Sequence, residues 1–299
     1  MMFEQLGLIG CGLMGGSFAL ALREAGLVRR VVGYSKSQRT RERALELGVI
    51  DSAAAELEGA VAGSDLVLLA VPVAATEPSL EAMRPLLGET TLLMDVGSTK
   101  CDVVAAARRA LGERLPRFVP AHPIAGKESA GVDHADAALY RERQVILTPL
   151  AETAPGLAAR AAAVWRALGS RVREMAPEDH DASYATVSHL PHLLAFAAMN
   201  AIQAQPQAQQ FLELAGPGFR DFSRIAASDP SVWRDILLAN RNEVIAQSRR
   251  FRAALDTLEA SMAAGDGATL QELIRQASAA RAGWQLCAGP KDNTLADPA

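Results

Sequence analysis

Two short segments of this 299-residue chain carry side chains suited to moving a proton. The first is Asp95-Val96-Gly97-Ser98-Thr99-Lys100, where an apolar run ends in a small polar turn. The second places His122 just after an expected strand, ahead of the small residues of 125–131. Histidine titrates near neutral pH, so it suits a general base that takes a proton from an alcohol. Ser98 could donate a hydrogen bond beside it, or Ser98 and Thr99 could simply cap the next helix.

A third segment, Ser188-His189-Leu190-Pro191-His192, combines with Arg224 further along the chain. His189 and His192 are three residues apart, so both should project from one helix face. A metal would need more ligands than these two, and no further cluster of cysteines or carboxylates completes a set, so we expect no metal. Arginine binds carboxylates through charge-assisted hydrogen bonds, which favours an anionic substrate. Alternatively, Arg224 could pair with Asp221 or Asp229.

The start of the chain contains a glycine pattern typical of dinucleotide binding. An apolar run at 5–9 opens into Gly-x-Gly-x-x-Gly, formed by Gly10, Gly12 and Gly15. The first glycine permits a tight turn, the second lets phosphates approach, and the third lets the next helix pack closely. The N–H groups at the start of that helix, which holds Leu13 and Met14, would face the pyrophosphate. We assign Val71, at the end of another expected strand, to the same cofactor site.

The residues after the second expected strand indicate which dinucleotide is preferred. An acidic residue commonly stands there and binds the adenosine ribose. Here Ser35 takes that place, followed by Lys36, Arg39 and Arg41, with no carboxylate until Glu42. A ribose 2′-phosphate would find a hydroxyl and cations, so we expect a preference for NADP, with NAD possible. Alternatively, the cations form the solvated face of a helix.

The pattern of the chain changes near Met175. Before it, β-branched runs alternate with Ala-rich segments, which predicts a parallel α/β sheet. The expected strands are residues 6–9, 31–34, 66–71, 91–95, 118–120, 145–148 and 171–175. After it, apolar-periodic stretches at 182–201, 231–255 and 268–282 predict helices. We therefore expect a Rossmann-type dinucleotide-binding domain at 1–175, an all-α substrate and dimerisation domain at 176–289, and a flexible tail at 290–299.

Composition narrows the class of protein. The net charge of −4 gives no basic field for nucleic acid. Cys11, Cys101 and Cys287 are too scattered for a disulfide framework, which fits a cytoplasmic protein. Neither a signal peptide nor a membrane span is expected, because the chain lacks a long apolar run. The helical part carries more apolar surface than one small domain needs, which favours a homodimer over a compact monomeric bundle.

These motifs together resemble the prephenate and arogenate dehydrogenase family of tyrosine biosynthesis, over nearly the whole chain. The resemblance rests on Gly-Leu-Ile-Gly-x-Gly-Leu-Met-Gly-Gly-Ser at 7–17, Asp-Val-Gly-Ser-x-Lys at 95–100, His-Pro-Ile-Ala-Gly-x-Glu-x-x-Gly at 122–131, Ser-His-Leu-Pro-His at 188–192 and Phe-x-Asp-x-x-Arg-Ile-Ala-x-Ser-Asp-Pro-x-x-Trp-Arg-Asp at 219–235. It implies oxidative decarboxylation with hydride transfer to NAD(P)+. Prephenate would give 4-hydroxyphenylpyruvate, and arogenate would give tyrosine.

The resemblance also implies roles for particular residues. His122 would be the base, Ser98 would orient it or the substrate hydroxyl, and Arg224 would anchor a substrate carboxylate. His192 would line the pocket, with His189 in support.

Substrate choice would depend on Glu128, whose charge would attract the ammonium of arogenate and repel the side-chain carboxylate of prephenate. Use of either substrate, or of both, stays open. Two other functions are weighed against this one. A dehydrogenase of the β-hydroxyacid type would carry a catalytic lysine where this chain has Ser-His-Leu-Pro-His. A non-catalytic NADP-binding sensor would need neither His122 nor Arg224.

Overall fold

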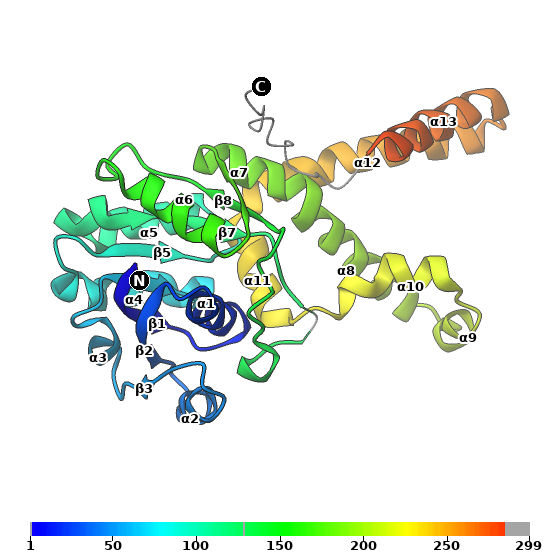
Figure 1. Cartoon of the computed structure of the whole chain (residues 1–299). Coiled ribbons are helices and arrows are strands. Elements are labelled where there is room, and N and C mark those ends of the chain that lie inside the picture. The colour runs from blue at the N-terminus through cyan, green and yellow to red at the C-terminus, as the bar shows by residue number, and fades with distance from the viewer. Residues whose placement is uncertain (1, 128, 285–299) are drawn as a thin grey trace, which may run out of the picture. The chain divides into compact units, whose positions relative to one another are not determined.

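The computed structural model describes residues 2–127 and 129–284 of the chain (Figure 1). The chain divides into two compact units, residues 1–244 and 245–299. The expected flexible tail at 290–299 lies outside the described residues. Within the described part of the chain, no helix is both long and apolar enough to cross a membrane.

The first unit begins with a six-stranded parallel sheet in the order β3-β2-β1-β4-β5-β6. Its strands are β1 (Phe3–Ile9), β2 (Val28–Tyr34), β3 (Ser52–Ala53), β4 (Leu66–Leu69), β5 (Leu92–Asp95) and β6 (Phe118–Val119). The strand order reverses beside β1, where Ile9 pairs with Tyr34 of β2 and with Leu69 of β4. The carboxyl ends at such a reversal form the crevice where α/β sheets bind nucleotides.

Helices cover both faces of this sheet. They are α1 (Leu13–Glu24), α2 (Gln38–Glu46), α3 (Leu57–Val61), α4 (Thr76–Met83), α5 (Cys101–Ala110) and α6 (Leu157–Ala167), with short 3-10 turns η1 (Val73–Ala75), η2 (Arg84–Leu86), η3 (Gly112–Arg117) and η4 (Val132–His134). Along β4, Leu66 and Leu68 belong to one buried cluster, whereas Val67 and Leu69 belong to another. Because strand side chains alternate, the sheet has a core on each face.

Three further strands form a second sheet, which the sequence did not predict as separate. They are β7 (Ala121–Pro123), β8 (Gln144–Leu147) and β9 (Arg171–Glu174), with β7 antiparallel to β8 and β8 parallel to β9. The prediction of one parallel sheet was therefore wrong at this edge, and β3 and β7 were missed. Both strands are too short to show an alternating pattern. His122 follows β6, as predicted, but it lies within the short strand β7, opposite Ile146.

Residues 177–244 are helical, as predicted for this part of the chain. They form α7 (Pro177–Tyr184), the π-helical segment η5 (Ala185–His189), α8 (Leu190–Gln203), α9 (Ala208–Glu213), α10 (Pro217–Ser223), η6 (Arg224–Ala227), α11 (Pro230–Ala239) and the start of α12 (Arg241–Ala263). The helix predicted at 231–255 is interrupted at Asn240, between α11 and α12. In the second unit, α12 continues and a turn at Gly265 leads into α13 (Gly267–Gly283), which Asp266 caps.

Candidate active site

A cavity of about 980 Å³ lies at the carboxyl ends of β1, β4 and β5. The turn before α1, the residues after β4 and β5, the segment after β7, α8, η6 and α11 all contribute to its walls. The lining residues include Gly12, Leu13, Met14, Val71, Gly97, Ser98, Lys127, His192, Arg224, Trp233 and Asp235. Predicted cofactor residues and predicted substrate residues therefore meet in one cavity.

The glycine-rich turn fits the pyrophosphate of a dinucleotide. Gly10 has φ +100°, and a Cβ there would lie 2.1 Å from the Ala70 oxygen. A Cβ on Gly15 would lie 2.1 Å from the Gly10 oxygen, so α1 can approach the turn only with glycine at this position. A Cβ on Gly12 would meet nothing within 4 Å, and α1 begins there without a side-chain cap. The first N–H groups of α1 can therefore receive an anion.

Ser35, Lys36 and Arg39 follow β2 and do not line this cavity. The Ser35 Oγ accepts a hydrogen bond from the Cys11 N–H at 2.8 Å, so Ser35 helps to hold the glycine-rich turn. Lys36 and Arg39 are exposed to solvent. They are therefore accessible at the position where the adenosine ribose of a dinucleotide is bound in this fold.

His192 and Arg224 line the same cavity as Ser98. The imidazole of His192 stacks on the Trp233 ring, with 3.5 Å between ring centroids. Its Nδ1 donates to the Ser188 carbonyl at 2.9 Å, which places the lone pair on Nε2. Burial lowers the pKa of His192, and Arg224 adds to the shift, whereas the Ser188 carbonyl opposes it. His192 is therefore neutral near pH 7 and can accept a hydrogen bond within the cavity.

The acidic residues near Arg224 have other partners. Asp221 lies 3.5 Å from Arg220, and Asp229 accepts hydrogen bonds from the N–H groups of Ser231 and Val232 at the start of α11. These are the two carboxylates that the sequence offered as alternative partners of Arg224. Glu128, the residue expected to govern substrate choice, lies outside the described residues.

His122 does not line the cavity but belongs to a buried polar cluster next to it. Its Nδ1 lies 2.8 Å from Nε2 of His180, and the Nδ1 of His180 lies 2.7 Å from Oδ1 of Asp181. The Asp181 carboxylate also accepts the N–H groups of Lys100 at 2.8 Å and Cys101 at 2.9 Å. A residue of α7 therefore caps α5, in place of the Ser98 or Thr99 cap weighed from the sequence.

A buried ion pair connects this cluster with the cavity wall. The Nζ of Lys100 lies 2.5 Å from Asp95 Oδ2 and donates to the Ala121 carbonyl at 2.9 Å. Asp95 accepts the N–H of Ala121 at 2.9 Å and that of Gly97, which lines the cavity, at 2.8 Å. The ion pair of Lys100 and Asp95 thus fixes both the N–H and the carbonyl of Ala121, the residue before His122.

His189 is buried and lies in the polar cluster rather than in the cavity wall. The Asn240 Nδ2 donates to the Asp181 carbonyl at 2.8 Å and to Nδ1 of His189 at 3.1 Å. Burial lowers the pKa of His189 to about 4. Of the two histidines expected on one helix face, His192 lines the cavity and His189 lies behind it, with its ring 6.1 Å from the Trp233 ring on which His192 stacks.

The charge states of the cluster follow from its burial. Burial lowers the pKa of His122 well below its usual value, and His180, Lys100 and His189 lower it further. Burial also lowers the pKa of His180, although Asp181 opposes the shift. The pKa of Asp181 is lowered despite burial, because His180 and the backbone of α5 donate to it. Near neutral pH the cluster holds neutral imidazoles and an ionised Asp181.

Sequence reasoning assigned no role to His180, Asp181, Trp233 or Asn240. A role for Trp233 could have been predicted, because Trp233 stands in the same sequence motif as Arg224. A weaker signal for His180 is that histidine is scarce, with five in the chain. No pattern in the neighbouring sequence indicates a role for Asp181 or Asn240, because the residues that they contact are far away in the sequence.

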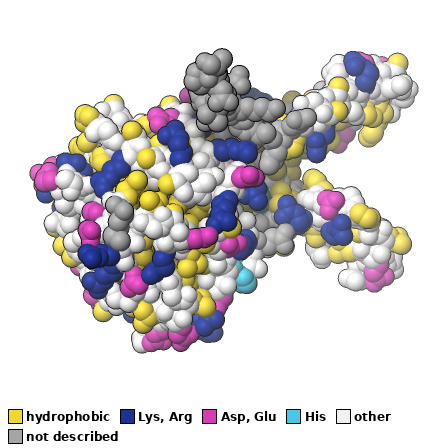
Figure 2. Space-filling view, in the orientation of Figure 1, with side chains coloured by type: hydrophobic (Ala, Val, Ile, Leu, Met, Phe, Trp, Pro, Cys, Tyr) yellow, Lys and Arg dark blue, Asp and Glu magenta, His cyan; other side chains and the backbone are white. Residues whose placement is uncertain are grey.

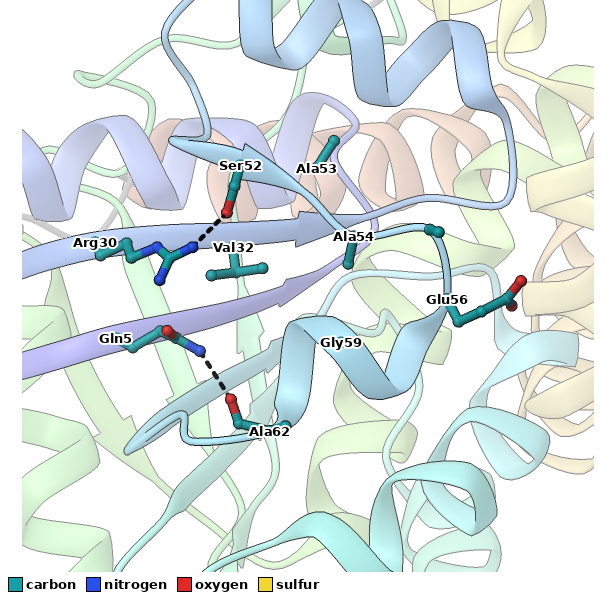
Figure 3. Close-up of a pocket in the computed structure, with 10 residues that line it drawn as sticks. Gln5, Arg30, Val32, Ser52, Ala53, Ala54, Glu56, Gly59 and Ala62 are labelled. Atoms are coloured by element: carbon teal, nitrogen blue, oxygen red, sulfur yellow. Dashed lines mark hydrogen bonds between the residues drawn. The ribbon is translucent and has the colours of Figure 1, made fainter.

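A second pocket, of about 490 Å³, lies near the amino-terminal ends of β1 and β2 (Figure 3). Its lining is less suited to dinucleotide binding and proton transfer. The Gln5 side chain donates to the Ala62 carbonyl, and Arg30 donates to Ser52 (Figure 3). The described residues that line it include none of the predicted site residues. Among the described residues of the whole chain, no group of three or more His, Cys, Asp or Glu could hold a metal ion.

Comparisons with known proteins agree with this geometry. The family model "Prephenate dehydrogenase, nucleotide-binding domain" matches residues 18–174, and "Prephenate dehydrogenase, dimerization domain" matches residues 176–276. The chain is 35% identical over 283 residues to cyclohexadienyl dehydrogenase of Zymomonas mobilis, covering 93% of this chain and 95% of that protein.

Two solved structures are also similar. One is prephenate dehydrogenase from Aquifex aeolicus in complex with hydroxyphenyl propionate and NAD+, with TM-score 0.88, 33% identity and coverage of 94% of this chain and 98% of that chain. The other is Synechocystis arogenate dehydrogenase, with TM-score 0.80, 28% identity and coverage of 93% and 99%. With two family models matched across most of its length, the chain belongs to the prephenate dehydrogenase family.

Proposed function

We propose that this NAD-dependent oxidoreductase converts prephenate to 4-hydroxyphenylpyruvate, arogenate to tyrosine, or both, in tyrosine biosynthesis. The observation that carries the proposal is the single cavity where the glycine-rich turn, Ser98, His192 and Arg224 meet. Relatives named for prephenate, arogenate and cyclohexadienyl substrates support it. When bound, the nicotinamide cofactor accepts a hydride from ring C4, and loss of carbon dioxide makes the ring aromatic.

His122 is the base in this proposal. It is neutral near pH 7 because burial lowers its pKa, and its Nδ1 is engaged with His180. Nε2 is then the atom that takes the proton from the C4 hydroxyl. The residue as a whole is half-buried, next to the cavity that Ser98 lines. Ser98, in the cavity wall, donates a hydrogen bond that orients the hydroxyl or the base.

Arg224 holds a substrate carboxylate in this proposal, because its guanidinium can donate two parallel hydrogen bonds. His192 lies beside it and offers a neutral Nε2 to a substrate hydroxyl. His189 supports this wall indirectly, from the buried cluster. Fixing both ends of the substrate aligns C4 with the cofactor, which is most of what such a reaction requires.

We infer a preference for NADP over NAD. Ser35 stands where a ribose-binding carboxylate is usual, and the Arg41 guanidinium donates to its carbonyl at 2.5 Å while lying 5.8 Å from the centre of the Tyr34 ring. Lys36 and Arg39 are exposed beside it. These cations and the Ser35 hydroxyl would bind a 2′-phosphate and leave no acidic group to repel it.

We also infer a cytoplasmic homodimer, with residues 1–175 binding the dinucleotide and residues 176–289 forming the substrate and dimerisation domain. Large apolar side chains are exposed on α12 and α13, including Leu255, Met262 and Ile274. Figure 2 shows hydrophobic side chains on the surface of this pair of helices. The match to a dimerisation-domain model over residues 176–276 supports this inference. Light scattering should give about twice the 31.6 kDa chain mass, and a monomer at micromolar concentration would contradict it.

The test of the function is reduction of NADP+ or NAD+, followed at 340 nm, with prephenate and with arogenate. Turnover of at least one substrate is expected. Absence of turnover with every combination of substrate and cofactor would contradict the proposal. His122→Asn should lower kcat by about 10²- to 10⁴-fold, the usual contribution of a general base. Unchanged kcat in that variant would remove only the assignment of the base.

A further inference from the structure

The buried cluster contains a second histidine and an aspartate to which the proposed chemistry gives no task. We propose that Asp181 and His180 form a relay to His122, in which Asp181 fixes the proton position on His180 and His180 fixes it on His122. The inference rests on the proposed function, because it makes both residues positioning residues for the base. It depends on four observed hydrogen bonds and on the chemistry of their atoms.

The relay starts at the Asp181 carboxylate. An ionised carboxylate can only accept hydrogen bonds, and this one accepts the N–H groups of Lys100 and Cys101. The Nδ1 of His180, 2.7 Å from Oδ1, must therefore carry a hydrogen. In the neutral imidazole the other nitrogen then has no hydrogen. Nε2 of His180 is consequently an acceptor.

The same reasoning applies to His122. Its Nδ1 lies 2.8 Å from the acceptor Nε2 of His180, so Nδ1 of His122 must be the donor. Neutral His122 therefore has its lone pair on Nε2, which is the form a general base needs. Without this contact the ring could carry its hydrogen on Nε2 instead. A ring in that tautomer has no lone pair to offer the substrate hydroxyl.

The relay also provides a place for positive charge. As His122 Nε2 takes the hydroxyl proton, the O–H electron pair becomes the C–O π bond while the hydride leaves C4 for the oxidised nicotinamide. The Nδ1 proton of the resulting imidazolium can then move to Nε2 of His180. His180 becomes the cation, 2.7 Å from the Asp181 carboxylate, and such a charge-assisted contact stabilises it.

The other charged and titratable groups around His122 have partners of their own. Lys100, before α5, is paired with Asp95. His189, on η5, accepts from Asn240. Tyr184, on α7, presents its ring to His122, with 4.9 Å between centroids. His180 is thus the group that contacts the His122 ring through a hydrogen bond.

Three variants separate this relay from a simple packing role. His180→Phe removes the acceptor, and Asp181→Asn removes the charge while offering an N–H that can reverse the tautomers. Each should lower kcat by about 10²- to 10⁴-fold, as when the carboxylate of a catalytic triad is replaced. The KM values for substrate and cofactor should change less than about threefold. His180→Gln keeps a carbonyl acceptor and should recover part of kcat.

Histidine NMR with ¹⁵N labels gives a readout that a packing role would not change. In the wild-type protein His122 and His180 should both carry hydrogen on Nδ1, whereas His189 should carry it on Nε2. In Asp181→Asn, His122 should shift toward the Nε2 tautomer. His134→Asn is the matched control, because His134 is exposed and outside the cluster, and it should keep the wild-type kcat.

The outcomes distinguish the relay from the function on which it rests. A wild-type protein inactive with both substrates would overturn the proposed function. An active wild type whose His180→Phe and Asp181→Asn variants keep their kcat and tautomers would overturn the relay alone. Because Asp181 also caps α5, its variant could fail to fold. The comparison of His180→Phe with His180→Gln then decides, since His180 caps no helix.

Discussion

At the scale of single residues, the cavity is defined by side chains that each have one clear chemical property. Arg224 supplies a cation, His192 a neutral acceptor, and Ser98 a hydroxyl, and all three line one cavity. Two of these residues come from helices after residue 176 and one from the turn after β5. Substitutions that change one property at a time are therefore informative.

Arg224→Ala should raise the KM for prephenate more than it lowers kcat. Loss of a charged clamp costs about 2–4 kcal/mol, which corresponds to about a 30- to 1,000-fold loss in kcat/KM. Arg220→Ala is the matched control, since Arg220 lies on the neighbouring helix, is exposed and pairs with Asp221. Steady-state kinetics with both variants measure this, and equal kcat/KM values would show that Arg224 does not hold the substrate.

Ser35→Asp should move cofactor preference toward NAD. The new carboxylate can still accept from the Cys11 N–H, so the turn is kept, but it would repel a 2′-phosphate. The NADP/NAD ratio of kcat/KM should fall by about 10- to 100-fold, equivalent to losing a charge-assisted hydrogen bond of about 1.5–3 kcal/mol. Kinetics with NAD+ serve as the internal control. A ratio that does not fall would mean that the phosphate binds elsewhere.

At the scale of elements, the site depends on how helices and strands are joined. The π-helical η5 lets Tyr184 and His189, five residues apart, remain near one side of the helix, whereas α-helical winding would separate them by about 140°. Asp181 caps α5 from α7, and Asn240, at the break between α11 and α12, binds the Asp181 carbonyl. The buried cluster is thus also a junction between the sheet and the helices.

Lys100→Met should destabilise this junction strongly. Removing one partner of a buried ion pair leaves Asp95 charged and uncompensated, at a cost of about 3–5 kcal/mol. Urea unfolding measures the change in the free energy of unfolding. The double variant Asp95→Asn/Lys100→Met should recover part of it, because both charges are removed. Arg275→Ala, which breaks an exposed pair on α13, should leave the midpoint unchanged. Equal changes in the free energy of unfolding for Lys100→Met and Arg275→Ala would contradict this account.

At the scale of the whole molecule, several buried histidines make stability depend on pH. Burial lowers the pKa of His122, His180 and His189 in the folded state. Below about pH 6.5 the unfolded chain binds protons that the folded chain does not. The free energy of unfolding therefore decreases as the pH is lowered. The contribution of each histidine is complete above pH 6.5 and is lost progressively as the pH falls toward its folded pKa.

The thermal midpoint should therefore fall between pH 7.5 and pH 5. For His189, whose pKa in the folded protein is about 4, the loss on reaching pH 4 is on the order of 3 kcal/mol. Calorimetry at three pH values in constant salt checks this. His189→Gln should weaken the dependence, since Gln does not titrate. A midpoint that rises on acidification across this range would contradict the assignment of neutral buried histidines.

Some features of this protein were determined by the sequence alone. Gly10 and Gly15 are required by the backbone of one turn, apolar runs mark the longer strands, and Arg224 stands in a recognisable motif. These features depend on neighbouring residues, whose effects on backbone conformation are local. The sequence therefore predicted the α/β and helical parts, the family resemblance and much of the cavity wall.

Only the tertiary structure decided how His122, the proposed base, is supported. It places His122 beside His180, 58 residues away, and joins Asp181 to the backbone of Lys100, 81 residues away. It also places His192 in the cavity lining, His189 in the buried cluster and His122 inside a three-residue strand. Such contacts depend on which strand edge and which helix face meet, and no local pattern records this because the partners lie far apart in the chain.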